Sequence, residues 1–85
     1  MTVRPTIRDL LAFGDITSIE LDDAVKAYLR DPTIGQFLLG DGLRINLKAA
    51  VHGNAHAMAI LRDRTSRTGA RRYVVRRALL DARPE

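Results

Sequence analysis

The stretch that most constrains the fold runs from residue 43 to residue 62, LRINLKAAVHGNAHAMAILR. Six of its residues recur at alternating steps of four and three, the spacing of one stripe along an α-helix. They are Leu43, Leu47, Ala50, Asn54, Ala57 and Leu61. Basic residues fall on the side away from this stripe, so the pattern predicts one long central helix over residues 43–62.

Length and composition limit the class of protein. A chain of 85 residues has room for one domain, here residues 1–85, and buries only about 60–65% of its unfolded surface. The absence of cysteine excludes disulfides and thiolate metal or redox sites. No apolar run approaches the roughly 18 residues of a membrane span. These features predict a cytoplasmic protein without membrane contact.

Two short stretches before the central one carry helix-start signals. Thr6 stands at an N-cap position, and Gly14 stands where a left-handed C-cap would end the helix. Thr17 and Glu20 have the spacing of a capping box, and Pro32 prevents that second helix from continuing. We therefore expect two helices before residue 31.

The next segment is ambiguous. Asp31-Pro32 suits the start of a short third helix through Leu39, followed by a tight turn at residues 40–42. The alternative is a strand at residues 36–39, which is disfavoured because it is short and isolated. A last helix is expected over residues 70–82, and no internal repeat is found. The predicted fold class is all-α, a small bundle of about five helices around the central helix 43–62.

The apolar periodicity also predicts the core. The residues expected to be buried are Leu21, Val25, Leu29, Phe37, Leu38, Leu47, Met58, Leu61 and Leu79. Ala49, Gly53 and Ala57 form a ridge of small side chains at steps of four, which suits close approach of another backbone. That backbone belongs either to the same chain or to a second copy, with Asn54 fixing the register of a homodimer through the central helix.

Catalytic and metal sites find little support. His52 and His56 are four residues apart, a spacing at which two imidazoles on one helix can share a metal, but a third ligand is missing. No nucleophile–base pair, carboxylate pair or phosphate-cradling glycine loop emerges from the spacing. We expect no enzyme activity, no metal and no cofactor.

Charge is unevenly distributed. Residues 1–61 hold six basic and seven acidic side chains, whereas residues 62–85 hold eight arginines and three acidic residues, which together make the net charge of +4. Such asymmetry indicates an anionic partner for the last third of the chain, and arginine suits phosphate contacts. Small, cysteine-free, arginine-rich chains of this kind are also common among phage-encoded products.

These observations predict a small regulatory nucleic-acid-binding protein, with DNA as the expected ligand. The predicted binding residues are Arg44, Lys48, Arg62, Arg64, Arg67, Arg71, Arg72, Tyr73, Arg76 and Arg77. A helix-turn-helix is one geometry for them, with the turn at residues 40–42 and Arg44, Asn46 and Lys48 at the start of the entering helix. The alternatives are a solvated basic surface and a helical module or inhibitor that docks on a larger protein.

Overall fold

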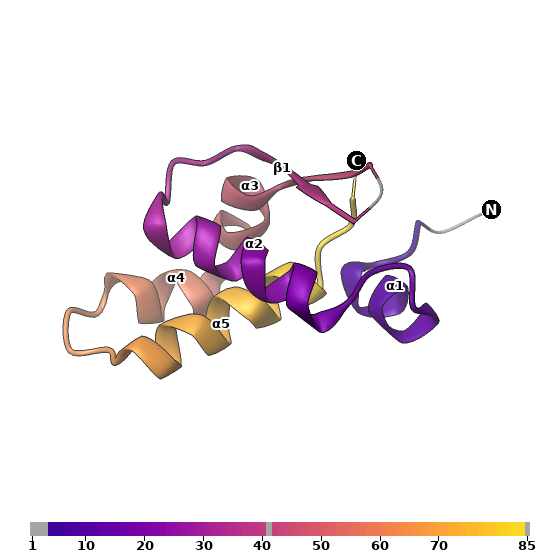
Figure 1. The fold of residues 1–85 in the computed structure, drawn as a ribbon. Coiled ribbons are helices and arrows are strands. Elements are labelled where there is room, and N and C mark those ends of the chain that lie inside the picture. The colour runs from indigo at the N-terminus through magenta and orange to yellow at the C-terminus, as the bar shows by residue number, and fades with distance from the viewer. Residues whose placement is uncertain (1–3, 41, 85) are drawn as a thin grey trace.

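The computed structural model describes residues 4–40 and 42–84. Within these ranges the chain forms five helices and a two-stranded sheet (Figure 1). The elements are α1 (Ile7–Phe13), α2 (Ser18–Arg30), β1 (Gln36–Leu39), β2 (Leu43–Asn46), α3 (Leu47–His52), α4 (Ala55–Arg62) and α5 (Thr68–Leu80). The protein is mostly helical, but the all-α prediction is wrong in one place, because residues 36–39 and 43–46 pair as the strands of a β-hairpin.

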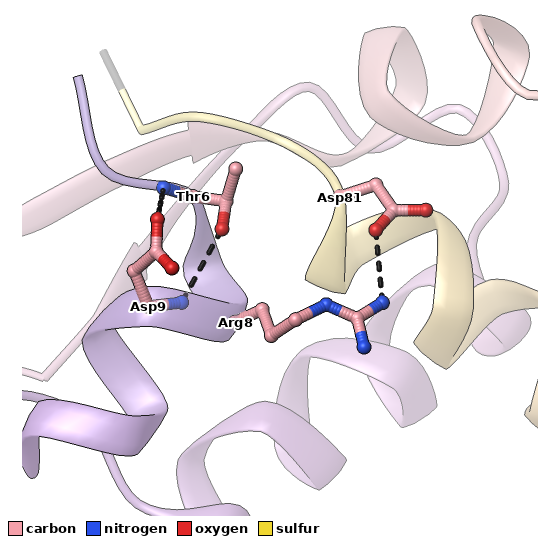
Figure 2. Close-up of polar contacts among 4 residues, drawn as sticks. All are labelled: Thr6, Arg8, Asp9 and Asp81. Carbon is pink, nitrogen blue, oxygen red and sulfur yellow. Dashed lines mark hydrogen bonds and ion pairs between the residues drawn. The ribbon is translucent and has the colours of Figure 1, made fainter. Parts of the chain in front are cut away.

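The first two helices begin as their sequences predict. The Thr6 hydroxyl accepts from the backbone N–H of Asp9 at 3.2 Å, and the Asp9 carboxylate accepts from the N–H of Thr6 at 3.0 Å (Figure 2). Thr17 and Glu20 make the same reciprocal pair at the start of α2. Each capping box satisfies two backbone donors that the helix leaves unpaired. Both predicted helix starts are confirmed.

The predicted third helix is wrong. Asp31 does not begin a helix; its carboxylate accepts from the backbone N–H of Thr33 at 3.1 Å and from the Thr33 hydroxyl at 2.6 Å. After this turn the chain enters β1, which pairs antiparallel with β2, Phe37 opposite Ile45 and Leu39 opposite Leu43. Gly40 and Gly42 have φ angles of 56° and 89°, a region that glycine enters without a steric cost, and Asp41 lies outside the described residues. The predicted tight turn therefore joins two strands and not two helices.

The continuous central helix over residues 43–62 is also wrong. Residues 43–46 are strand, and the helical part is interrupted between α3 and α4. Gly53 is the C-cap of α3, and Asn54 takes an extended conformation and accepts from the N–H of Ala57 at 2.9 Å. Asparagine at an N-cap is strongly favoured, whereas glycine and asparagine are both poor in a helix interior. The asparagine expected to set a dimer register instead starts α4.

The core lies where α5 packs on α2, α3 and α4, and the hairpin contacts α2 through β1. Its fully buried members include Ile7, Ile16, Leu21, Leu39, Ile45, Leu47, Val51, Val75 and Leu79. Of the predicted core, Leu21, Val25, Leu47 and Leu79 are buried, and Leu29, Phe37, Met58 and Leu61 are partly buried. Leu38 is 62% exposed, because in β1 it points away from the core, opposite Arg44.

Arg4 and residues 81–83 meet beside α1. The N–H of Ile7 donates to the carbonyl of Ala82 at 2.9 Å, and the guanidinium of Arg8 pairs with Asp81 at 2.9 Å (Figure 2). Arg83 donates from Nε to the carbonyl of Arg4 at 3.0 Å. We call this region, α1 with Arg4 and residues 81–83, the closed end. Among the described residues, no helix is both long and apolar enough to cross a bilayer.

Candidate nucleic-acid interface

The exposed side of α5 carries the densest group of predicted binding residues. Val74, Val75, Ala78 and Leu79 are buried against the core, as their spacing predicts. The opposite side therefore presents Arg72, Tyr73, Arg76 and Arg77, which we call the arginine face. Arg72 and Arg77 are exposed, and Tyr73 is 59% exposed, large for an aromatic side chain. The helix thus fixes three guanidinium groups around one accessible ring.

A groove runs between the arginine face of α5 and α2. These two helices lie side by side (Figure 1). Its volume is about 410 Å³, and it is lined by Asp22, Val25, Lys26, Gly69, Arg72, Tyr73 and Arg76. Asp22 forms an ion pair with Arg76, so this arginine is held against α2. Lys26 and Arg72 line the same groove, and a side chain at Gly69 would meet nothing within 4 Å. With Asp22 set against Arg76, the lining of the groove keeps a net positive charge from Lys26 and Arg72.

On its other flank the arginine face borders α4. Tyr73 and Arg77 line a smaller hollow of about 240 Å³ together with Asn54, His56, Val74 and Asp81. Tyr73 lines both hollows, one of them together with Arg72 and the other together with Arg77. An aromatic ring flanked by cations is the arrangement that allows a base to stack while phosphates are neutralised.

The remaining predicted residues lie elsewhere. Arg62 and Arg71 line a separate recess between α2, α4 and α5, and Arg64 and Arg67 are exposed in the α4–α5 loop. Arg44 is on β2 and lines a hollow of the hairpin, while Lys48 is the second residue of α3. The structure therefore does not gather all ten residues into one surface.

The helix-turn-helix geometry is contradicted by the hairpin. Arg44 belongs to a strand, and the Asn46 side chain accepts from the N–H of Ala49 at 2.9 Å as the N-cap of α3. Asn46 is thus committed to its own helix and not positioned for base edges. An entering helix that begins with Arg44, Asn46 and Lys48 does not exist in this fold.

The two histidines do not share a site. The helix is interrupted at Gly53, so His52 is the last residue of α3 and His56 belongs to α4. His52 lines the recess with Arg62 and Arg71, whereas His56 lines the hollow beside Arg77. Across residues 4–40 and 42–84, three or more histidine or carboxylate side chains nowhere gather as metal ligands would. The small-residue ridge is also lost, since a Cβ on Gly53 would meet only the carbonyls of Ala49 and Ala50.

Acidic neighbours offset few of these arginines. In the part of the chain that the structure describes, ion pairs join Arg8 to Asp81 and Arg76 to Asp22, and none involves Arg72 or Arg77. Asp63, beside the loop arginines, accepts from the Thr65 hydroxyl and N–H, and these hydrogen bonds hold the pKa of the carboxyl below its usual value. The Asp63 carboxylate is engaged locally, and Arg72 and Arg77 of the arginine face remain available to an external anion.

Sequence reasoning missed Lys26. It lines the groove from α2, whereas the predicted basic groups lay only on the central and last stretches. The available signal was its position four residues after Asp22, on the same exposed side of α2. That spacing does not reveal that α5 packs alongside.

The chain matches no protein-family model, and no curated protein or solved structure matches it significantly. The site itself is therefore the basis for any functional assignment.

Proposed function

We propose that this chain is a small regulatory nucleic-acid-binding protein, acting on DNA in the cytoplasm through the arginine face of α5. The observation that carries the proposal is the exposed Tyr73 flanked by Arg72 and Arg77, neither of which forms an ion pair with any described residue. Arg72 and Arg77 are five residues apart, about 7.5 Å along a helix axis. One DNA strand carries about two phosphates over such a length, so both guanidinium groups can be neutralised together.

The expected contacts are to phosphates and to the faces of bases. Guanidinium groups bind phosphate oxygens through two donors, and phosphate contacts position a protein without reading sequence. Tyr73 offers a ring on which an unpaired base can stack. Since no helix enters from residue 43, nothing in this geometry supports base-edge readout by Arg44 or Lys48.

The test is binding of fluorescent duplex and single-stranded DNA, measured by anisotropy over a series of salt concentrations. Arg72→Gln with Arg77→Gln should weaken binding and reduce the slope of log affinity against log salt on duplex DNA by about 0.9 for each lost phosphate contact. The matched control is Arg8→Gln with Arg83→Gln, which removes the same charge from the closed end. If both double variants lose the same affinity, binding follows net charge and the assigned face is wrong.

The stacking contribution has its own test. Tyr73→Ala should weaken single-stranded DNA binding by about 5-fold to 150-fold, since a base–aromatic stack is worth about 1–3 kcal/mol. Tyr73→Phe keeps the ring and should bind as the unaltered chain does. If the unaltered protein binds neither DNA nor RNA at low salt, the proposal fails. The arginine face would then suit an acidic surface on a larger protein.

A further inference from the structure

The recess between α2, α4 and α5 is a second concavity, and Tyr73 does not line it. Its volume is about 350 Å³, within the range of small-molecule pockets. It is lined by Tyr28, Leu29, Pro32, His52, Met58, Leu61, Arg62, Thr68 and Arg71. None of these residues lines the groove beside the arginine face. The recess therefore needs its own explanation.

The inner surface of the recess is apolar. Leu29, Met58 and Leu61 pack against the core but remain only partly buried, although their spacing predicts full burial. All three open into this recess. Tyr28 is 3% exposed beside them, and burial raises the pKa of its phenol, so the ring stays neutral. An apolar body placed here would complete the burial of three side chains that the rest of the chain leaves half covered.

The rim is cationic and comes from different helices. Arg62 ends α4 and Arg71 lies in the first turns of α5, and among the described residues neither has a carboxylate partner. Thr68, the first residue of α5, adds a hydroxyl, and the preceding Arg67 makes no side-chain cap. The start of a helix adds positive potential to that of the two guanidinium groups. The rim thus favours an anionic group at the mouth of an apolar recess.

We infer that this recess binds a small organic anion with an aromatic or aliphatic body. The body lies on Leu29, Met58 and Leu61, and its carboxylate or phosphate is held by Arg62 and Arg71. The volume suits a small molecule. This inference is independent of nucleic-acid binding, because the two sites share no residue.

The experiment is an NMR titration with naphthalene-2-carboxylate, following the methyl signals of Leu29, Met58 and Leu61. We expect saturable shifts at these methyls. Naphthalene-2-carboxamide, which lacks the charge, and inorganic phosphate, which lacks the body, should each bind at least about tenfold more weakly, because a hydrogen bond to a charged group contributes about 1.5–3 kcal/mol. Equal binding of the amide would overturn the role of the cations.

A matched pair of variants locates the anion. Arg62→Gln with Arg71→Gln should weaken naphthalene-2-carboxylate by about tenfold or more, whereas Arg64→Gln with Arg67→Gln, the same change on the neighbouring loop, should alter it less than about twofold. Equal losses in the two variants, or no saturable shift in the unaltered protein, would refute the inference. Shifts that depend on protein concentration and not on the probe would assign the recess to a second copy of the chain, which also overturns it.

Discussion

Arginines behave differently at the closed end and at the α4–α5 loop, residues 63–67. Those of the closed end contact distant parts of the chain, whereas those of the loop make no ion pair with any described residue. At the closed end, Arg8 pairs with Asp81 and Arg83 reaches the carbonyl of Arg4, contacts between residues more than seventy positions apart. At the loop, side-chain hydrogen bonds are short-range: Asp63 holds Thr65, and the Ser66 hydroxyl donates to the carbonyl of Ile60. One region is joined by tertiary contacts and the other by local ones.

This difference bears on function. At the closed end the side chains of Arg8 and Arg83 have protein partners, whereas Arg62, Arg64, Arg67 and Arg71 make no ion pair with any described residue. A side chain that is not needed for folding can be changed without disturbing the fold. Variants at the loop and on the arginine face should therefore report on binding, and variants at the closed end should report on stability.

The largest expected effect is that of Leu47→Ala, because Leu47 is fully buried and belongs to the core of the whole domain. Truncation should cost about 2–5 kcal/mol, enough to melt a small domain. Thermal unfolding monitored by circular dichroism and by tyrosine fluorescence should show one coincident, lowered transition. A melting temperature within a degree or so of the unaltered protein would mean that the core has been misassigned.

Asn54→Ala should have the next largest effect on stability. It should act on α4, the helix before the α4–α5 loop, and not on the closed end. Losing the N-cap of α4 should cost about 0.5–2 kcal/mol, since the N–H of Ala57 loses its acceptor. Amide hydrogen exchange should accelerate more in α4 than in α1. The mass in solution should not change; a shift from dimer to monomer would instead restore the interpretation of Asn54 as a register residue.

Arg8→Gln and Arg64→Gln compare the two regions directly. The side chains of Arg8 and Asp81 are 50% and 57% exposed, so their pair should contribute less than about 1 kcal/mol. Arg64→Gln should leave the stability unchanged within error, because Arg64 has no ion-pair partner among the described residues. Urea unfolding of the two variants measures the difference, and a larger loss from Arg64→Gln would contradict the division into two regions.

The smallest effect concerns acid stability. Hydrogen bonds from Thr65 and Thr33 lower the pKa of Asp63 and Asp31 below the ordinary value of 3.8. A carboxyl whose pKa is depressed by folding stabilises the protein above that value and stops doing so as the pH falls through the folded pKa. Asp63→Asn should flatten the acid limb of a plot of melting temperature against pH. An unchanged limb would show that the Thr65 contact is not retained in solution.

Asp31 and Asp63 also show how much of the fold the local sequence determines. LRDPT at residues 29–33 and LRDRT at residues 61–65 end α2 and α4 in the same way, with an aspartate at the C-cap bound to the threonine two residues later. The two segments share four of their five residues. After Thr33 the chain enters a strand, and after Thr65 it enters a helix. The motif determines where a helix stops but not which element comes next.

The hairpin shows why the central stretch was misinterpreted. In residues 43–46 apolar and polar side chains alternate, as in a half-buried strand, but Leu43 and Leu47 also fit a helical step of four. The hydrogen bonds between β1 and β2, and the burial of Leu39 and Ile45 to 1% exposure, favour the strand. Four residues are too few to distinguish the two-residue period of a strand from the period of a helix. The choice between strand and helix is made by the partner strand and by the core that covers it.

Local sequence is sufficient to specify the starts of α1 and α2, the stop before Pro32 and the buried side of α5. Each depends on interactions within about one helical turn, which the spacing of residues displays directly. The pairing of the arginines, by contrast, is established by packing. Asp22 and Arg76 lie 54 positions apart, and they meet because α2 and α5 pack side by side. The recess at Arg62 and Arg71 arises from the same packing, since its concavity depends on which helices become neighbours, whereas Arg72, Tyr73 and Arg77 share one exposed face of α5 through their spacing alone.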